Sequence, residues 1–365
     1  MKNTAHVGAA FRGPIKATVI AAAIACLLLP LSPSFIERWY STGFYPVVQR
    51  LLTPAANLFP FALFDLITIA AAALAVRAIV RAIRLARQTR SWRPAWTTTV
   101  NVATAAAAVY VVFLVCWGFN YRRVPMAARL VIDRGAPSED AVAALGLHAI
   151  EQMNALYAAA HAAGDVPPWR DERLRAAFDA VQGYLTDAPR AVPGRLKQTI
   201  YGPYFRWTSV DGMVDPFALE VMANPDLLPI ERPFVAAHEW SHLAGYADES
   251  EANFVGWLTC LRASDAAQYS GWMYLYWQLA NEVSGPMRAK LWAALAEGPR
   301  ADVDAIVARL RRGQLPALQR SSWALYDTYL KANRVEAGVR SYGLVVTLIL
   351  RAKFDEGWKP VRRSP

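Results

Sequence analysis

Two long apolar runs constrain the fold of this 365-residue chain more than any other feature. One extends from about Phe59 to Val80 and the other from Thr97 to Phe119, and each is long enough to cross a hydrocarbon core of about 30 Å. A shorter run, from Ala17 to Leu31, follows a basic N-terminus. No small-residue cleavage site follows it, so we favour an uncleaved span over a signal peptide. The sequence therefore predicts three transmembrane helices, at about residues 17–32, 59–80 and 97–119.

The distribution of charge predicts the orientation of these spans. The net charge is +10, and most of the excess lies in two segments that contain no acid, residues 1–16 and 77–96. The positive-inside rule places both segments in the cytoplasm. The chain after Phe119 then lies outside, which in a Gram-negative cell is the periplasm. We therefore expect a multi-pass protein of the bacterial inner membrane, in contact with the lipid bilayer, and no nucleic-acid partner.

Residues 120–365 are predicted to form one mostly α-helical extracytoplasmic domain with a small β-sheet. Apolar periodicity predicts two early helices, followed by a segment rich in Pro, Gly and aromatic residues, with strands at 198–205 and 218–223. Helices then resume, at about 231–244, 249–263, 266–283, 287–296, 301–311, 317–332 and 335–352. The last helix is apolar but short, so we expect it in the core rather than in the membrane. The three cysteines support neither a disulfide framework nor a zinc finger.

The motif that carries chemistry is His238-Glu239-Trp-Ser-His242. Histidines four residues apart lie on one face of a helix, so both imidazoles can reach a single metal ion. Glu239 follows the first histidine and can accept a proton from a metal-bound water. Two imidazoles and a carboxylate suit zinc best among the divalent metals. The alternative is a buried helix with two histidines that bind no metal.

A catalytic zinc needs a third protein ligand and an open position. Asp248 stands where the three-histidine pattern HExxHxxGxxH has its last histidine, and a new helix begins there. Glu251 shares the apolar face of that helix, and a carboxylate on a buried face needs a cation. We therefore predict Glu251 as the third ligand, with Glu249 as its rival. A capping box with Asp248 as N-cap and Glu251 three residues later is the structural alternative.

The segment from His238 to Phe254 resembles gluzincin-type zinc peptidases, in several of which a Glu in an E-A-N-like helix supplies the third ligand. The whole chain resembles a bacterial family described only as a domain of unknown function, with N-terminal membrane helices and a C-terminal HExxH domain. That resemblance is carried by segments 60–65, 117–122, 249–254 and 329–343. It implies a membrane-bound zinc metallopeptidase with a zincin-like (gluzincin) domain, and it implies no particular substrate.

Together these features predict a zinc-dependent hydrolase, a peptidase, with His238, His242 and Glu251 as metal ligands and Glu239 as general base. Its partner would be a peptide or protein substrate that is extracytoplasmic or membrane-associated. Residues 218–223 could form an edge strand that holds an extended peptide. The oxyanion donor stays open among Tyr204, Tyr274, Tyr326 and Tyr342. The alternative function is a catalytically weak zincin-like scaffold that acts as a membrane sensor or assembly factor, although the presence of Glu239 favours the enzyme.

Overall fold

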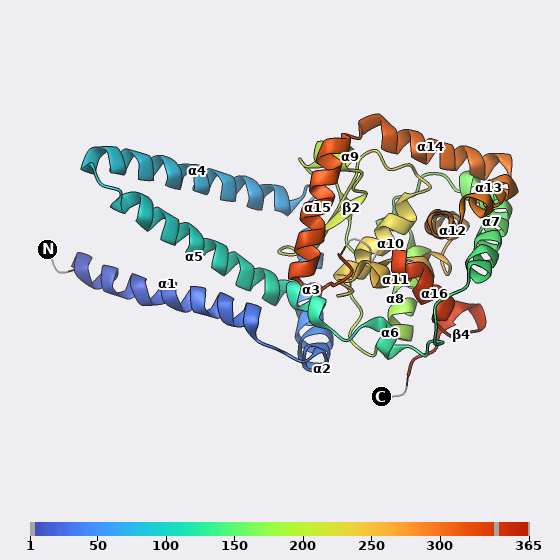
Figure 1. The fold of residues 1–365 in the computed structure, drawn as a ribbon, viewed down its shortest axis with the longest axis horizontal. Coiled ribbons are helices and arrows are strands. Elements are labelled where there is room, and N and C mark those ends of the chain that lie inside the picture. Colours follow the sequence, from blue (N-terminus) through green and yellow to red (C-terminus); the bar gives the residue numbers. More distant parts are fainter. Residues whose placement is uncertain (1–3, 339–342, 364–365) are drawn as a thin grey trace.

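The computed structural model describes residues 4–338 and 343–363, with the backbone alone for residues 4–12. The chain is mostly helical, with two small β-sheets. Three helices, α1 (Thr4–Leu28), α4 (Leu63–Thr89) and α5 (Arg93–Cys116), project together from a body that contains the remaining elements (Figure 1). Helix α5 packs against both α1 and α4.

Helices α4 and α5 are long and apolar enough to cross a membrane, which confirms the two longer predicted spans as helices of that kind. The side chains in the apolar window of α4 are all outside the protein core. The first run overlaps the helical stretch Gly13–Leu28, which meets the same test only together with the next helix, Pro33–Asn57, from which it is bent by 112°. The described residues therefore hold two candidate spans, or three if this bent pair counts as one.

Residues 33–57, which precede the spans α4 and α5, belong to the body. They form one continuous helix of three parts, α2 (Pro33–Phe35), the π-helical η1 (Ile36–Phe44) and α3 (Tyr45–Asn57). The inward side chains Ile36, Tyr40 and Tyr45 join the main hydrophobic core. This helix lies before the domain boundary predicted at residue 120, yet it shares one core with the helices after that boundary.

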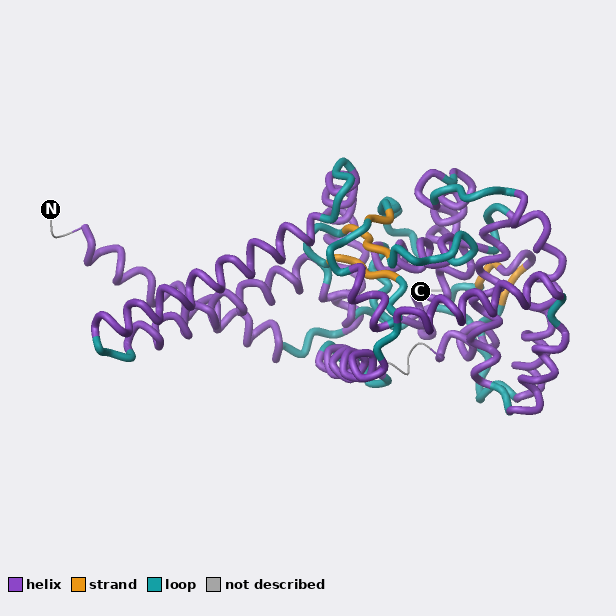
Figure 2. The backbone as a smooth tube through the Cα atoms, turned by 90° about the horizontal axis from the view of Figure 1, so that it is seen from above, coloured by secondary structure: helices purple, strands orange, loops and turns teal. Residues whose placement is uncertain are grey.

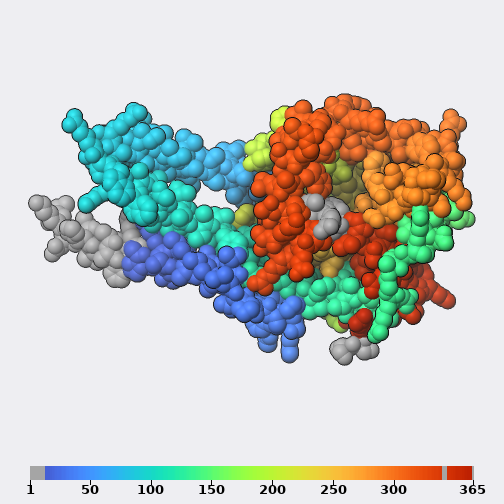
Figure 3. Space-filling view, viewed as in Figure 1, coloured from blue at the N-terminus to red at the C-terminus, as the bar shows by residue number. Residues whose placement is uncertain are grey.

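The body consists mostly of helices, with a few short strands (Figure 2). Helix α10 (Arg232–Leu243) lies among them and packs against α8 (Glu172–Leu185), α11 (Glu249–Cys260) and α12 (Asp265–Glu282). The other helices of the body are α6 (Met126–Arg129), α7 (Glu139–Ala162), α9 (Gly202–Thr208), α13 (Gly285–Ala294), α14 (Glu297–Gly313), α15 (Pro316–Ala332) and α16 (Leu344–Arg351). Helix α16 is short, and its inward side chains Val345, Val346, Leu348 and Ile349 join the main hydrophobic core, as expected. Figure 3 shows α15 on the surface, beside the end of α5.

A three-stranded sheet lies beside α10, with the strand order β1 (Leu196–Lys197), β3 (Glu220–Ala223), β2 (Gly212–Asp215). Strand β1 is parallel to β3, and β2 is antiparallel to it. A second sheet pairs β4 (Phe354–Asp355) with β5 (Lys359–Pro360).

Two sequence predictions about the larger sheet are wrong. The strand predicted at 198–205 is replaced by a turn and by α9, which begins with a Gly-Pro pair; proline is well suited to the first turn of a helix. Residues 218–223 do not form an edge strand, because β3 has a hydrogen-bonded neighbour on each side. Among the described strands of this sheet, β2 is an outer one, and it packs against α10.

Candidate metal centre

Helix α10 brings His238 and His242 together, as their spacing predicted. Their Nε2 atoms lie 3.2 Å apart. The carboxylate oxygen Oε2 of Glu249, from α11, lies 3.4 Å from the His238 nitrogen and 3.5 Å from the His242 nitrogen. These three residues form the one cluster among the described His, Cys, Asp and Glu side chains whose donor atoms could share a metal ion.

The size of this triangle fits a zinc ion. Nitrogen and oxygen donors lie about 2.0–2.1 Å from zinc, so two donors in a tetrahedral site are about 3.3 Å apart. All three sides of the triangle are close to that value. Three protein ligands leave a fourth position free, which is the arrangement of catalytic rather than structural zinc sites.

Close packing of α11 on α10 positions Glu249. At Gly256 of α11, an added Cβ would lie 3.0 Å from the backbone nitrogen of His238, so only a glycine lets the two helices approach this far. Asp248 is the N-cap of α11, and its carboxylate accepts hydrogen bonds from the amides of Ser250 and Glu251. The cap fixes where the helix begins and therefore the direction in which Glu249, its first residue, points.

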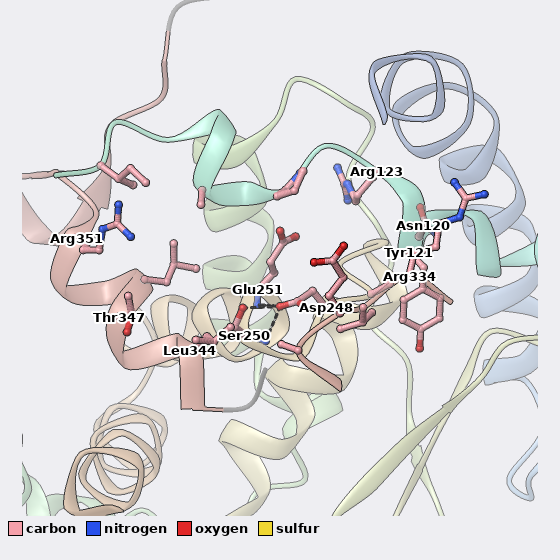
Figure 4. A pocket seen from close by; sticks show the side chains of 18 residues that line it. Asn120, Tyr121, Arg123, Asp248, Ser250, Glu251, Arg334, Leu344, Thr347 and Arg351 are labelled. Atoms are coloured by element: carbon pink, nitrogen blue, oxygen red, sulfur yellow. Dashed lines mark hydrogen bonds between the residues drawn. The ribbon is translucent and has the colours of Figure 1, made fainter. Parts of the chain in front are cut away.

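Glu251, the predicted third ligand, faces away from the two histidines, and this prediction is corrected by the structure. Its Oε1 accepts a hydrogen bond from the amide of Met126, and its Oε2 lies 3.7 Å from the guanidinium of Arg129. The side chain lines a separate pocket of about 490 Å³, between the start of α11 and α16 (Figure 4). Glu251 therefore ties α11 to the segment that comes directly after the spans.

The reason for the error is the complete burial of α11. The prediction assumed one inward face, but all twelve residues of this helix are buried. Residues two positions apart on a helix are separated by about 200° around the helix axis, so Glu249 and Glu251 point to nearly opposite sides. A carboxylate on a buried face does need a cation, and Glu251 has Arg129. The signal that could have found Glu249 is the small-residue stripe Ala252 and Gly256, one and two turns further on the same face.

The environment of the cluster suits a cation. His242 donates from Nδ1 to the carbonyl of Tyr246 at 2.8 Å, which leaves its Nε2 lone pair directed at the cluster. Burial alone would raise the pKa of Glu249, but the charge of His242 and hydrogen bonds from both histidines hold it well below its ordinary value. Burial opposes a proton on His242, yet Glu249 raises its pKa to about 9. The buried carboxylate and the two imidazoles thus form a site that favours positive charge between them.

Glu239 lies beside the cluster and is almost completely buried. Burial raises the pKa of its carboxyl group, although the charge of His238 opposes that rise. Its Oε2 has no hydrogen-bond partner among the described residues. The other side of this carboxylate is limited by β2, because a Cβ added at Gly212 would overlap Glu239 Oε1. The carboxylate of Glu239 is therefore held between the cluster and the outer strand β2.

The four candidate tyrosines have different positions. Tyr326, on α15, donates a hydrogen bond of 2.5 Å to Glu249 Oε1, the oxygen that does not face the histidines. Tyr204 is hydrogen-bonded to Ser322 instead. Tyr274 stacks on Phe234, with ring centroids 3.6 Å apart. Tyr342 lies outside the described residues. Of the three described tyrosines, Tyr326 is the one with a hydrogen bond to a residue of the cluster, and this bond holds the Glu249 carboxylate in its orientation.

Two cavities meet at the cluster, and His238, Glu239 and Trp323 line both. The cavity nearer to the end of α5, here called the membrane-side cavity, has a volume of about 560 Å³ and lies between α9, β2, α15 and the segment that follows α5. The distal cavity, about 370 Å³, lies between α10, α12 and α14. The cluster therefore has open space on two sides, and both spaces reach His238 and Glu239.

A comparison with protein families matches almost the whole chain. The sequence model described as "Protein of unknown function (DUF3810)" covers residues 40–350. The chain belongs to the DUF3810 family. The matched region of this DUF3810 chain begins within the helix 33–57, includes α4 and α5, and contains all three residues of the cluster. No curated protein and no solved structure matches the chain.

Proposed function

We propose that this DUF3810 chain is a membrane-anchored, zinc-dependent hydrolase, a peptidase with a zincin-like body. The observation that carries the proposal is the triangle of His238 Nε2, His242 Nε2 and Glu249 Oε2, whose sides of 3.2–3.5 Å suit a tetrahedral zinc ion. The ligand set of two histidines from one helix and a glutamate from the next is that of the gluzincins, with Glu249 rather than Glu251 as the glutamate.

Zinc in this site would supply a Lewis acid that lowers the pKa of a bound water towards about 7. Glu239 then has the role of general base, because its unpartnered Oε2 is buried next to His238. It accepts a proton from the attacking water and returns it to the leaving amine. Burial keeps its pKa above the ordinary value, which makes it a stronger base than an exposed carboxylate.

Strand β2 is the element that supports a peptide rather than a small ester as substrate. It is an outer strand, it lies against Glu239, and its residues Gly212, Met213 and Val214 line the membrane-side cavity. An extended peptide can pair with such a strand through main-chain hydrogen bonds, with its side chains directed alternately into the cavities. The strand that holds substrate is therefore β2, and not residues 218–223.

The basic segment between α4 and α5 supports a periplasmic location for the body. The stretch 77–96 carries six arginines and no acid, and it forms the far end of the α4–α5 hairpin. The positive-inside rule places this turn in the cytoplasm. The body at the other end of the hairpin then lies on the periplasmic side of an inner membrane.

A direct test compares the full chain with Glu239→Gln, both reconstituted in lipid vesicles with one equivalent of zinc. We expect wild type to hydrolyse a mixture of quenched fluorescent peptides, and Glu239→Gln to keep its zinc but lose at least about 100-fold in rate, the range for a general base. Equal rates for both chains would reject the proposal. A zinc-loaded wild type with no turnover would favour the scaffold alternative.

A further inference from the structure

The helix formed by residues 33–57 has an apolar stripe on its outer side. Large apolar side chains recur about one turn apart and are exposed, and Leu51 and Leu58 are 67% and 80% exposed. The stripe comprises Phe35, Trp39, Phe44, Val47, Leu51 and Leu58. The acid of this helix, Glu37, is turned inward and paired with Arg123, whereas Arg38 and Arg50 are exposed. A helix with apolar and basic groups outward is typical of one that lies in an anionic membrane surface.

The direction of this helix agrees with that location. It is bent by 112° from the end of α1, so it runs across the direction of the projecting helices. Figure 1 shows α3 and α15 at the end of the body from which α1, α4 and α5 project. If α4 and α5 cross the bilayer, helix 33–57 lies along its surface, with the Phe59 and Phe61 side chains exposed just before α4 begins.

The membrane-side cavity reaches the same surface. Trp117 and Tyr121, which line it, directly follow α5, whose last residue is Cys116. Trp117 also donates from its indole to the carbonyl of His242 at 3.0 Å, so the metal centre begins where the span ends. On the opposite wall, Leu325 of α15 and Tyr204 of α9 line the cavity and are 73% and 37% exposed. Exposed apolar side chains therefore occur both on the helix 33–57 and at this cavity, whose wall begins directly after α5.

The composition of the lining points to the class of substrate. None of the described residues that line the membrane-side cavity is a lysine or arginine, whereas Glu239 and Glu249 are both present. Outside the metal centre, a phosphate headgroup would find no lysine or arginine among the described lining residues to pair with its charge. The outer strand β2, whose residues Gly212, Met213 and Val214 line the cavity, offers main-chain groups to a peptide. Trp117, Phe205, Val214 and Leu325 offer apolar surface for the side chains of a peptide.

We propose that the membrane-side cavity accepts the apolar juxtamembrane segment of a membrane-anchored polypeptide, so that the bond beside the metal centre is one close to the bilayer. This inference rests on the proposed peptidase function for the cleavage step. The position of the cavity at the membrane surface can be tested by a measurement that does not depend on peptide hydrolysis.

The first experiment measures the depth of the cavity mouth. A fluorophore is attached at Leu325→Cys in the full chain, in which Cys26 and Cys116 are replaced by alanine and Cys260 stays buried. The chain is reconstituted in vesicles of phosphatidylethanolamine and phosphatidylglycerol that carry a spin label near the headgroup. We expect loss of fluorescence at 325, and none at the control Leu147→Cys of α7. Equal fluorescence at both positions would overturn the proposal.

The second experiment measures which bonds are cleaved. A peptide library is linked to a diacyl lipid either directly or through a flexible Gly/Ser spacer of about 40 residues, which keeps it at the vesicle but lets it move away from the surface. We expect zinc-loaded wild type to cleave the directly linked library at bonds within about ten residues of the anchor, roughly 30 Å of extended chain. Glu239→Gln is the blank.

Preference for the directly linked library by about tenfold or more supports the proposal, since both libraries have a similar local concentration. Equal cleavage of the two would overturn it while leaving the peptidase function intact. Cleavage of neither library would reject the peptidase function and with it the substrate assignment, whereas the fluorescence result would still place the cavity mouth in or out of the bilayer.

Discussion

The hydroxyl of Tyr326 lies on the outer oxygen of Glu249, opposite the side that faces the histidines. Hydrogen bonds of this kind hold a ligating carboxylate in one orientation. We expect Tyr326→Phe to weaken zinc binding by about 10- to 100-fold, the range for such outer-shell partners. Competition with a chromogenic chelator measures the affinity. The control is Tyr204→Phe, which removes a hydroxyl bonded to Ser322 from the same cavity and should leave zinc affinity unchanged.

We expect Glu251 to contribute to the stability of the fold and not to metal binding. Its carboxylate is buried and satisfies the amide of Met126 beside Arg129. We expect Glu251→Gln to lower the free energy of unfolding by about 1–3 kcal/mol, the cost of disturbing a buried polar contact. Denaturant unfolding of the full chain in detergent measures this loss. An unchanged midpoint would show that the negative charge beside Arg129 contributes nothing, because glutamine keeps an oxygen that can accept from the Met126 amide.

The histidine pair was predictable at this scale, and its third partner was not. The 100° rotation per residue of a helix alone brings positions 238 and 242 to one face. The choice between Glu249 and Glu251 depends on which neighbours surround α11, and that follows from long-range packing with α10 and with the segment at Met126. No local pattern separates two acids on a helix that is buried all round.

Strand β2 depends on one glycine to lie close to the general base. A methyl group at Gly212 would occupy the space of the Glu239 carboxylate. We expect Gly212→Ala to displace that carboxylate and lower the hydrolysis rate by about tenfold or more, since small misplacements of catalytic groups have large effects. Zinc content should stay at the wild-type level. The matched control is Gly285→Ala at the start of α13, where nothing lies within 4 Å of an added Cβ; a similar loss there would point to a general loss of folding.

Short elements were the least predictable ones. The long helices follow from apolar periodicity and from caps such as Ser138 and Asp171, whose side chains accept bonds from the first turns of α7 and α8. By contrast, β1 contains two residues, and it exists only because Leu196 pairs with Val221. Strand pairing over such a separation leaves no local signal, which is why 198–205 was predicted as the strand and 218–223 as the edge.

Side chains from the part of the chain before residue 120 are bonded to α10, the helix that carries His238 and His242. Tyr45 donates to the carbonyl of Leu243 at 2.8 Å, and Trp117 donates to that of His242. Thr53 donates in the same way to Leu219, in the turn before β3. Hydropathy alone predicted the two long spans, because a lipid-facing helix is apolar all round. It could not reveal that the helix between the first two apolar runs belongs to the core of the body.

This arrangement predicts that residues 120–365 do not form a stable domain alone. A fragment of these residues lacks Tyr45 and Trp117, exposes the apolar surface that helix 33–57 covers in the full chain, and leaves two carbonyls of α10 without these partners. We expect it to aggregate and to show no cooperative unfolding by circular dichroism. A fragment of residues 33–365 retains these contacts and should unfold cooperatively and bind one zinc ion. Equal behaviour of the two fragments would contradict the prediction.

The most direct test of the metal centre is zinc content per chain, measured by inductively coupled plasma mass spectrometry on the purified full chain. The geometry predicts one zinc in wild type, one in Glu239→Gln and one in Glu251→Gln, because neither carboxylate belongs to the ligand triangle. It predicts loss of zinc in His238→Ala and in Glu249→Gln. A wild-type chain without stoichiometric metal, or a Glu249→Gln chain that binds zinc as tightly as wild type, would contradict it.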